Sequence, residues 1–160
     1  MPSTAADPGL ELIERFYTAF TELDGVTMAA CYAPGAHFAD PVFTDLNGEQ
    51  PGAMWRMLTG RAKDLRVRLS EHSADGGRGR AHWIADYTFA ATGRRVHNDV
   101  RAEFRFENGL IADHRDSFPF HAWARQALGP AGLLLGWTPF LRAKVRRQAQ
   151  AGLDEFMART

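Results

Sequence analysis

Three side chains suited to acid–base chemistry stand close to aromatic residues in this sequence. His114 and Asp116 are two residues apart in the segment HRDSF, and Asp40 precedes Pro41 in the segment FADP. Residues two apart on a strand point to the same side, so His114 and Asp116 would share one face. A carboxyl group buried among aromatic side chains has its pKa raised toward neutrality, where it can both take and give a proton. Asp116, His114 and Asp40 are therefore the predicted catalytic residues, although an Asp before a proline is also a common turn element.

A meander of four antiparallel strands is predicted to position this pair. Apolar and polar side chains alternate from Leu65 onward, and turn sequences interrupt the alternation at residues 75–80, at Thr92-Gly93 and at Asn108-Gly109. A period of two is typical of half-buried strands, and short glycine-containing turns join antiparallel neighbours. The last strand, over residues 110–118, contains the pair.

The register of the last hairpin decides which side chains face the core. A three-residue turn over residues 107–109 directs His114 and Asp116 inward. A two-residue turn would direct Asp113 and Arg115 inward instead, because a slip of one residue reverses every side chain. In the first register, the expected strand partners are Phe106 with Leu110, Phe104 with Ala112, Ala102 with His114, Val100 with Asp116, Tyr87 with Asn98 and Trp83 with Ala102.

The first register, with the three-residue turn, predicts an apolar pocket with a few convergent polar groups, which is the usual form of a small-molecule site. In that pocket His114 could protonate an enolate oxygen or hold a substrate carbonyl. Asn98 could donate a hydrogen bond to a developing oxyanion. The residues predicted to contact a ligand are Tyr17, Phe38, Trp55, Trp83, Tyr87, Asn98, Phe104 and Phe118.

Helices are predicted on both sides of the strands. After Asp7-Pro8, apolar residues recur at three- and four-residue steps and predict a helix to about Leu23. A short helix over residues 26–32 and a third over residues 54–62 follow. Helices grouped before a meander define an α+β fold, in which three N-terminal helices cover one face of a curved antiparallel sheet.

The C-terminal part is predicted to extend this fold. Residues 1–125 are expected to form one domain, and residues 126–160 an apolar segment and a basic amphipathic helix that starts at Thr138-Pro139. Packing of this helix on its own domain or on a partner subunit is favoured over contact with an anionic membrane. Residues 133–135, together with Trp137, could cover the mouth of the pocket.

Three short motifs and the order of the elements carry a family resemblance. FADP at residues 38–41, TGR at residues 92–94 and HRDSF at residues 114–118 resemble motifs of the nuclear transport factor 2-like superfamily. Ketosteroid isomerases, limonene epoxide hydrolases and SnoaL-like polyketide cyclases belong to it. The resemblance covers about residues 8–125. It implies a cone-shaped, cystatin-like sheet, a homodimer and chemistry without a metal or cofactor. It also favours the first register, in which Asp116 points inward and does acid–base work.

The catalytic machinery of two of these families is incomplete here. Asp40 resembles the isomerase base, but the isomerase tyrosine falls on Phe16 and the acid of its oxyanion hole falls on Ala102. Tyr17 is one residue off that tyrosine position and would face elsewhere. Asp116 resembles an epoxide hydrolase acid, whereas the Arg-x-Asp motif of those enzymes has no counterpart in the same frame.

Composition limits the remaining classes of function. The 160 residues carry 19 basic and 19 acidic side chains, and this balance argues against a general nucleic-acid binder. The single cysteine, Cys31, permits no internal disulfide. A signal peptide and a membrane-spanning stretch are not apparent, so a cytoplasmic protein is expected. The histidine spacing fits no metal motif, and neither a metal nor a cofactor is expected.

The sequence thus leads to two hypotheses from different classes. The first is a SnoaL-like protein that isomerises, cyclises or hydrates a small apolar molecule by cofactor-free acid–base chemistry, as a homodimer. The alternative is a non-catalytic module of the same fold that binds a ligand or mediates dimerisation.

Overall fold

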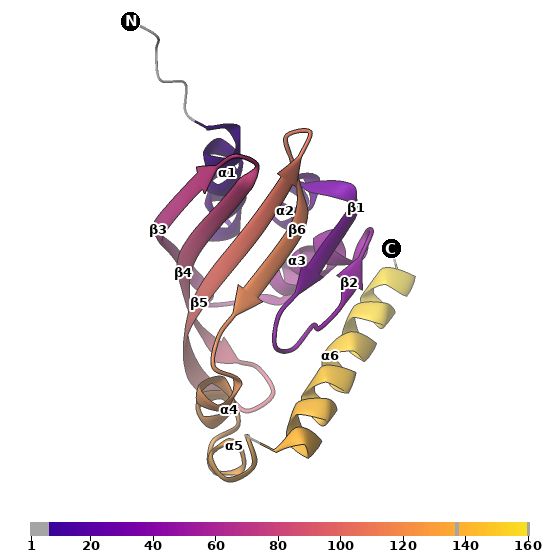
Figure 1. Cartoon of the computed structure of the whole chain (residues 1–160). Helices are drawn as coiled ribbons and strands as arrows, with labels where there is room; N and C mark the ends of the chain where they lie inside the picture. Colours follow the sequence, from indigo (N-terminus) through magenta and orange to yellow (C-terminus); the bar gives the residue numbers. More distant parts are fainter. Residues whose placement is uncertain (1–6, 137, 160) are drawn as a thin grey trace, which may run out of the picture.

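An open, curved sheet of six strands is the centre of the fold (Figure 1). The computed structural model describes residues 7–136 and 138–159, so Trp137 lies outside the described residues. In space the strand order is β2-β1-β6-β5-β4-β3. The strands are β1 (Tyr32–Ala39), β2 (Leu46–Asn47), β3 (Arg66–Asp75), β4 (Arg78–Phe89), β5 (Arg94–Glu107) and β6 (Leu110–Ser117).

The N-terminal helices lie on one face of this sheet, and the helices that follow β6 in the chain lie at its end and along its side (Figure 1). The N-terminal helices that cover the face are α1 (Pro8–Thr21), α2 (Gly25–Ala30) and α3 (Gln50–Arg61). The helices that follow β6 are α4 (Phe120–Leu128), α5 (Pro130–Leu135) and α6 (Pro139–Ala158). This arrangement confirms the predicted α+β fold. No helix within the described residues is long and apolar enough to cross a membrane.

One strand departs from the predicted antiparallel meander. β1 pairs in parallel with β6, so the sheet is mixed. The sequence placed residues 26–32 in a helix, but α2 ends at Ala30 and the chain enters β1 at Tyr32. Pro34-Gly35 interrupts the alternation of this strand and coincides with the register irregularity between Tyr32 and His37. That interruption concealed the strand.

The β5–β6 hairpin combines features of both predicted registers. Its turn is the two-residue Asn108-Gly109, with positive φ angles of 52° and 75°, and Phe106 pairs with Ile111 rather than Leu110. The register then shifts by one residue, because Ala112 has no partner and forms a β-bulge. Beyond the bulge, the partners are Phe104 with His114 and Ala102 with Asp116. The predicted turn was wrong, yet the bulge restores the predicted inward orientation of the pair.

The pairing of β4 with β5 differs from the expected register by two residues. Trp83 pairs with Val100 rather than Ala102, and Tyr87 pairs with Val96 rather than Asn98. A shift by an even number leaves each side chain on its predicted face of the sheet.

Helix α6 packs on the domain through most of the apolar side chains along one of its faces. Its Leu153 is fully buried, and Arg146 Nε donates a hydrogen bond to the carbonyl oxygen of Pro41 over 3.0 Å. The guanidinium of Arg56 in α3 lies over the ring of Phe156. Phe140, at the start of the helix, is 73% exposed and is the exception.

Candidate active site

A chain of hydrogen bonds runs through the buried interior from Trp55 to Asp116. Trp55 Nε1 donates to the hydroxyl oxygen of Tyr32 over 2.7 Å. That hydroxyl lies 2.7 Å from His114 Nδ1, and His114 Nε2 lies 2.8 Å from Asp116 Oδ1. His114 is fully buried and Asp116 is 6% exposed. The chain needs β1 beside β6, because Tyr32 lies on the first of these strands and His114 on the second.

The chemistry of these groups determines the direction of the hydrogen bonds. An indole N–H can only donate, so the Tyr32 oxygen accepts from Trp55; in the arrangement that gives every group a partner, the Tyr32 hydroxyl then donates to His114 Nδ1. Nδ1 is then the unprotonated nitrogen, and Nε2 carries the proton that is donated to Asp116. A neutral His114 satisfies every group in the chain. Both of its ring nitrogens are engaged, so the imidazole orients the Asp116 carboxylate and has no free N–H for a substrate.

Aromatic rings enclose the imidazole of His114. Its centroid lies 4.3 Å from that of Phe104, 4.9 Å from that of Phe38 and 5.7 Å from that of Phe16. Trp55 stacks on it at 6.3 Å. This packing fixes the ring plane, and through it the orientation of the carboxylate.

Two buried donors near this group have no hydrogen-bond partner among the described residues. They are the hydroxyl of Tyr17 and Nε1 of Trp83, whose rings lie 6.1 Å apart. Burial, and then the negative charge of Asp116, raises the pKa of Tyr17 well above its usual range. Tyr17 therefore remains a hydrogen-bond donor, and it lies close enough to Asp116 to sense its charge. A buried donor without a partner costs about 1–3 kcal/mol, which an acceptor on a bound molecule would relieve.

Asp40 lies immediately after β1, at the end of the sheet that holds Asp116. Its Oδ1 accepts hydrogen bonds from the backbone N–H groups of Val42 (2.7 Å) and Phe43 (2.6 Å), which is the turn element that the sequence offered as an alternative. Burial raises the pKa of Asp40 to about 7, with a further contribution from the negative charge of Asp116. Asp40 therefore holds this turn, and with a pKa of about 7 it can also exchange a proton at neutral pH.

The other polar residues predicted for the pocket lie at the same end. The Tyr87 hydroxyl accepts a hydrogen bond from Nε1 of Trp123 in α4 over 2.8 Å. Asn98 is half-buried, and among the described residues its side chain forms no hydrogen bond. Phe118 is half-buried and packs against the cluster that α4 forms on the sheet. Sequence reasoning missed Trp123 and Tyr32, and only the aromatic character of these residues signalled a buried role.

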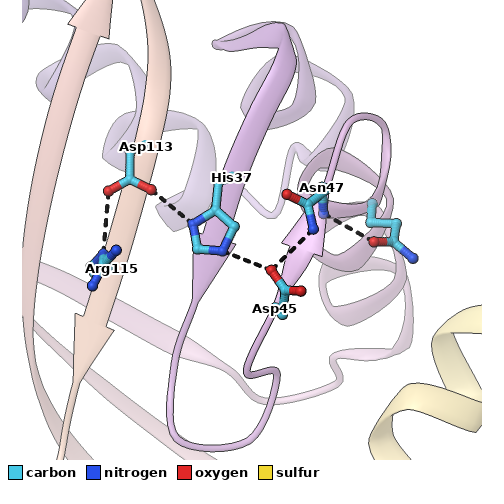
Figure 2. A network of polar contacts seen from close by, with 6 residues as sticks. His37, Asp45, Asn47, Asp113 and Arg115 are labelled. Carbon is cyan, nitrogen blue, oxygen red and sulfur yellow. Dashed lines mark hydrogen bonds and ion pairs between the residues drawn. The ribbon is translucent and has the colours of Figure 1, made fainter.

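The residues of the alternative register lie on the other face of the sheet (Figure 2). There His37 stands between two carboxylates, with Nδ1 2.8 Å from Asp113 and Nε2 2.9 Å from Asp45. Arg115 donates to Asp113 over 3.3 Å, and Asn47 donates to Asp45 over 3.0 Å. These residues form a surface network. Within the described residues, no group of His, Cys, Asp and Glu side chains could hold a metal ion.

The predicted lining residues pack against one another in the interior. The Trp55 ring lies 5.7 Å from Phe38 and 6.3 Å from Trp83. Two open hollows in the surface are lined by neither His114 nor Asp116, although Tyr32 lines the second of them. One, of about 270 Å³, lies beside the start of α1; the other, of about 410 Å³, lies between α2 and α3.

Comparison with known proteins identifies the family of this chain. Residues 13–114 match the model of the SnoaL-like domain, and the chain belongs to this family. No curated protein sequence matches it significantly.

Solved structures share its nuclear transport factor 2-like fold. An epoxide hydrolase of M. tuberculosis, described as LEH-like, is 20% identical with a TM-score of 0.62; the match covers 84% of this chain and 95% of that one. A Catenulispora acidiphila protein with a ketosteroid isomerase-like fold, in complex with trimethylamine, is 14% identical with a TM-score of 0.66 and coverages of 81% and 98%. TsrD from Streptomyces laurentii is 24% identical with a TM-score of 0.62 and coverages of 74% and 93%. At these identities the likeness concerns the fold alone.

Proposed function

We propose that this protein catalyses cofactor-free acid–base chemistry on a small apolar molecule, with Asp116 as the base. The observation that carries the proposal is the hydrogen-bond chain from Trp55 through Tyr32 and His114, which holds one oxygen of a buried carboxylate in a fixed orientation. The other oxygen, Oδ2, receives no hydrogen bond from the described residues and is available for a proton.

The unpartnered hydroxyl of Tyr17 complements this base. Asp116 takes a proton from the carbon beside a substrate carbonyl, and negative charge develops on the carbonyl oxygen. Tyr17 donates a hydrogen bond to that oxygen, which stabilises the enolate. Return of the proton to a different carbon gives an isomer, while attack of the enolate carbon on a second carbonyl gives a ring. Neither outcome needs an oxidant, a reductant or a metal.

Asp40 supplies the complementary acid in this proposal. Its pKa of about 7 keeps part of the population protonated at neutral pH, and Asp116 lies near enough for the two charges to interact. Two carboxyl groups with different environments are a common basis for separate acid and base roles. The activity should therefore fall as the pH rises above about 7, and Asp40→Asn should remove this dependence from the pH profile of kcat/KM.

A screen of apolar carbonyl, lactone and epoxide compounds tests the proposal, with wild type and Asp116→Asn examined for both binding and turnover. The variant should bind a substrate but lose at least about 100-fold in turnover, the contribution expected of a positioned base. Asp113→Asn is the matched control, because Asp113 lies on the same strand but on the outer face. Equal turnover by wild type and Asp116→Asn would contradict the assignment.

The second candidate function is binding without catalysis, and the filled interior favours it. Aromatic side chains enclose His114, the hydrogen-bond partner of Asp116, and neither residue lines the two surface hollows. If wild type and Asp116→Asn bind the same compounds equally and neither converts them at any pH, a ligand-binding module replaces the enzyme.

A further inference from the structure

Four large apolar side chains on α5 and at the start of α6 are exposed. The end of α5 and the start of α6 lie close together at one end of the molecule (Figure 1). The exposed fractions of the four side chains are 52% for Leu133, 68% for Leu134, 46% for Leu135 and 73% for Phe140. We name these four residues the apolar tip. The other large apolar side chains with comparable exposure among the described residues, Val26 and Leu58, stand singly on α2 and α3. A contiguous exposed apolar patch marks a surface that contacts a partner or a membrane.

The chain around the apolar tip is strongly basic. Between Asp116 and Asp154 the sequence contains no acidic residue but five basic ones, whereas the whole chain has a net charge of zero. The remainder of the chain therefore carries 14 basic and 19 acidic side chains, which is a net charge of −5. The five basic residues are Arg125, Arg142, Lys144, Arg146 and Arg147.

These basic residues divide into two groups. Arg142 lies over the ring of Phe120, and Arg146 donates to Pro41, so both hold α6 on the domain. Arg125, Lys144 and Arg147 are exposed and form no ion pair with the described residues. Lys144 and Arg147 follow Phe140 by four and seven residues, which places the three on one face of the helix.

We propose that the apolar tip docks this protein on an anionic lipid bilayer. Leu134 and Phe140 insert between the acyl chains, while Lys144 and Arg147 contact the negatively charged headgroups. An apolar wedge beside exposed Lys and Arg side chains has the chemistry of a peripheral membrane anchor. A second copy of this chain fits the tip less well, because a symmetric contact would bring two sets of basic residues together. Membrane docking does not depend on the activity at Asp116.

Vesicle flotation of the full chain tests this docking. The probes are vesicles of pure phosphatidylcholine and vesicles that also contain phosphatidylglycerol, at low and high salt. Wild type should float with the anionic vesicles at low salt only. The double variant Leu134→Ser/Phe140→Ser and the double variant Lys144→Ala/Arg147→Ala should each reduce the bound fraction at least tenfold.

Matched control variants distinguish docking through the apolar tip from a general effect of removing exposed apolar or basic side chains. Val26→Ser removes an apolar side chain that is 71% exposed on α2, and Arg66→Ala/Arg68→Ala removes two exposed bases from β3. Both controls should float like wild type, and all variants should keep the thermal midpoint of wild type. Three results would overturn the proposal: failure of wild type to bind anionic vesicles, equal binding by the tip variants, or a change of oligomeric state as the only effect of the tip variants.

Discussion

At the scale of single residues, Tyr32 is the group that gives the buried hydrogen-bond chain its direction. Its hydroxyl accepts from Trp55 and donates to His114, and both partners are buried. Replacement by Phe leaves an indole N–H and an imidazole nitrogen without partners. Tyr32→Phe should therefore lower the free energy of unfolding by about 1–3 kcal/mol and release the constraint on the His114 tautomer.

Nitrogen NMR of the imidazole checks this prediction. In wild type His114 should carry its proton on Nε2, and in Tyr32→Phe the signals should indicate a mixture of tautomers. Tyr87→Phe is the control, because it removes a hydroxyl that accepts from Trp123 but does not contact His114. An unchanged His114 spectrum in Tyr32→Phe would show that the direction of the chain has another origin.

Asp40 should make the stability of the protein depend on pH. Its pKa is about 7 in the folded chain and near 3.8 without the surrounding structure, so between these values the folded state binds a proton that the unfolded state lacks. The free energy of unfolding therefore falls as the pH rises from about 4 to about 7. The decrease is at most about 4 kcal/mol, because one pKa unit corresponds to about 1.4 kcal/mol and solvent screens the partly exposed carboxylate.

Denaturant titrations of Asp40→Asn at a series of pH values check this dependence. The Asn side chain can still accept from Val42 and Phe43 but does not titrate, so the variant should gain stability relative to wild type at pH 8 and not at pH 4. Asp45→Asn, on the exposed side of the sheet, is the control. Parallel pH profiles of Asp40→Asn and wild type would exclude an effect of burial on this carboxyl group.

At the scale of elements, the bulge at Ala112 decides which side chains of β6 enter the core. Ile111 and Ala112 are both buried although they are adjacent, and His114 and Asp116 then point inward. Insertion of one alanine between Ala112 and Asp113 would shift the pairing beyond the bulge by one residue and direct Asp113 and Arg115 inward, whereas deletion of Ala112 would remove the bulge and keep the observed pairs. Because unpaired charges would replace the aromatic-enclosed pair in the insertion variant, we expect loss of its cooperative thermal transition.

Calorimetry of the insertion variant tests this role of the bulge. Deletion of Ala112 is the control, since it keeps the pairs Phe104–His114 and Ala102–Asp116 and should retain a cooperative transition. An insertion variant that melts like wild type would mean that β6 can restore its inward face by another route.

The same elements indicate how far the sequence could predict this structure. Periodicity predicted α1 and the faces of β4 and β5 correctly, because packing against a core repeats the same signal along many residues. The parallel strand β1 was missed, since Pro34-Gly35 breaks its alternation and its partner β6 lies some 80 residues away. The bulge was missed for a related reason: the turn sequence is local, whereas the extra residue is accommodated by long-range packing.

The candidate site was predictable only in part. His114 and Asp116 could be placed on one face from their spacing, and their neighbourhood followed from the strand order. The Tyr32–His114 contact depends on the parallel pairing of β1 and β6, which alternation alone does not reveal. The role of His114 as an orienting group therefore became visible only with the structure.

At the scale of the whole molecule, α4 and α5 lie beyond the end of β6, and α6, which we name the cap, runs from there along the side of the domain past β2 (Figure 1). Helix α4 is held on the sheet by several hydrogen bonds, among them those from Trp123 to Tyr87 and from Arg94 to Gln126. The cap itself is attached by the hydrogen bond from Arg146 to Pro41, the contact of Arg56 with the ring of Phe156 and the fully buried Leu153. These attachments are few compared with the pairing that joins β4, β5 and β6. We therefore expect the cap to open locally, at a lower free energy than global unfolding.

Amide hydrogen exchange under native conditions measures this opening. Amides of α6 should exchange faster than those of β5, and Leu153→Ala should lower the opening free energy of α6 by about 2–5 kcal/mol through loss of its buried anchor. Ile13→Ala is the matched control, because it removes an equally buried side chain from α1 and should lower the stability of β5 without changing the local opening of α6. If α6 instead exchanges only with global unfolding, in step with β5, the cap does not move independently. A ligand would then have to reach Asp116 between the aromatic side chains of the interior.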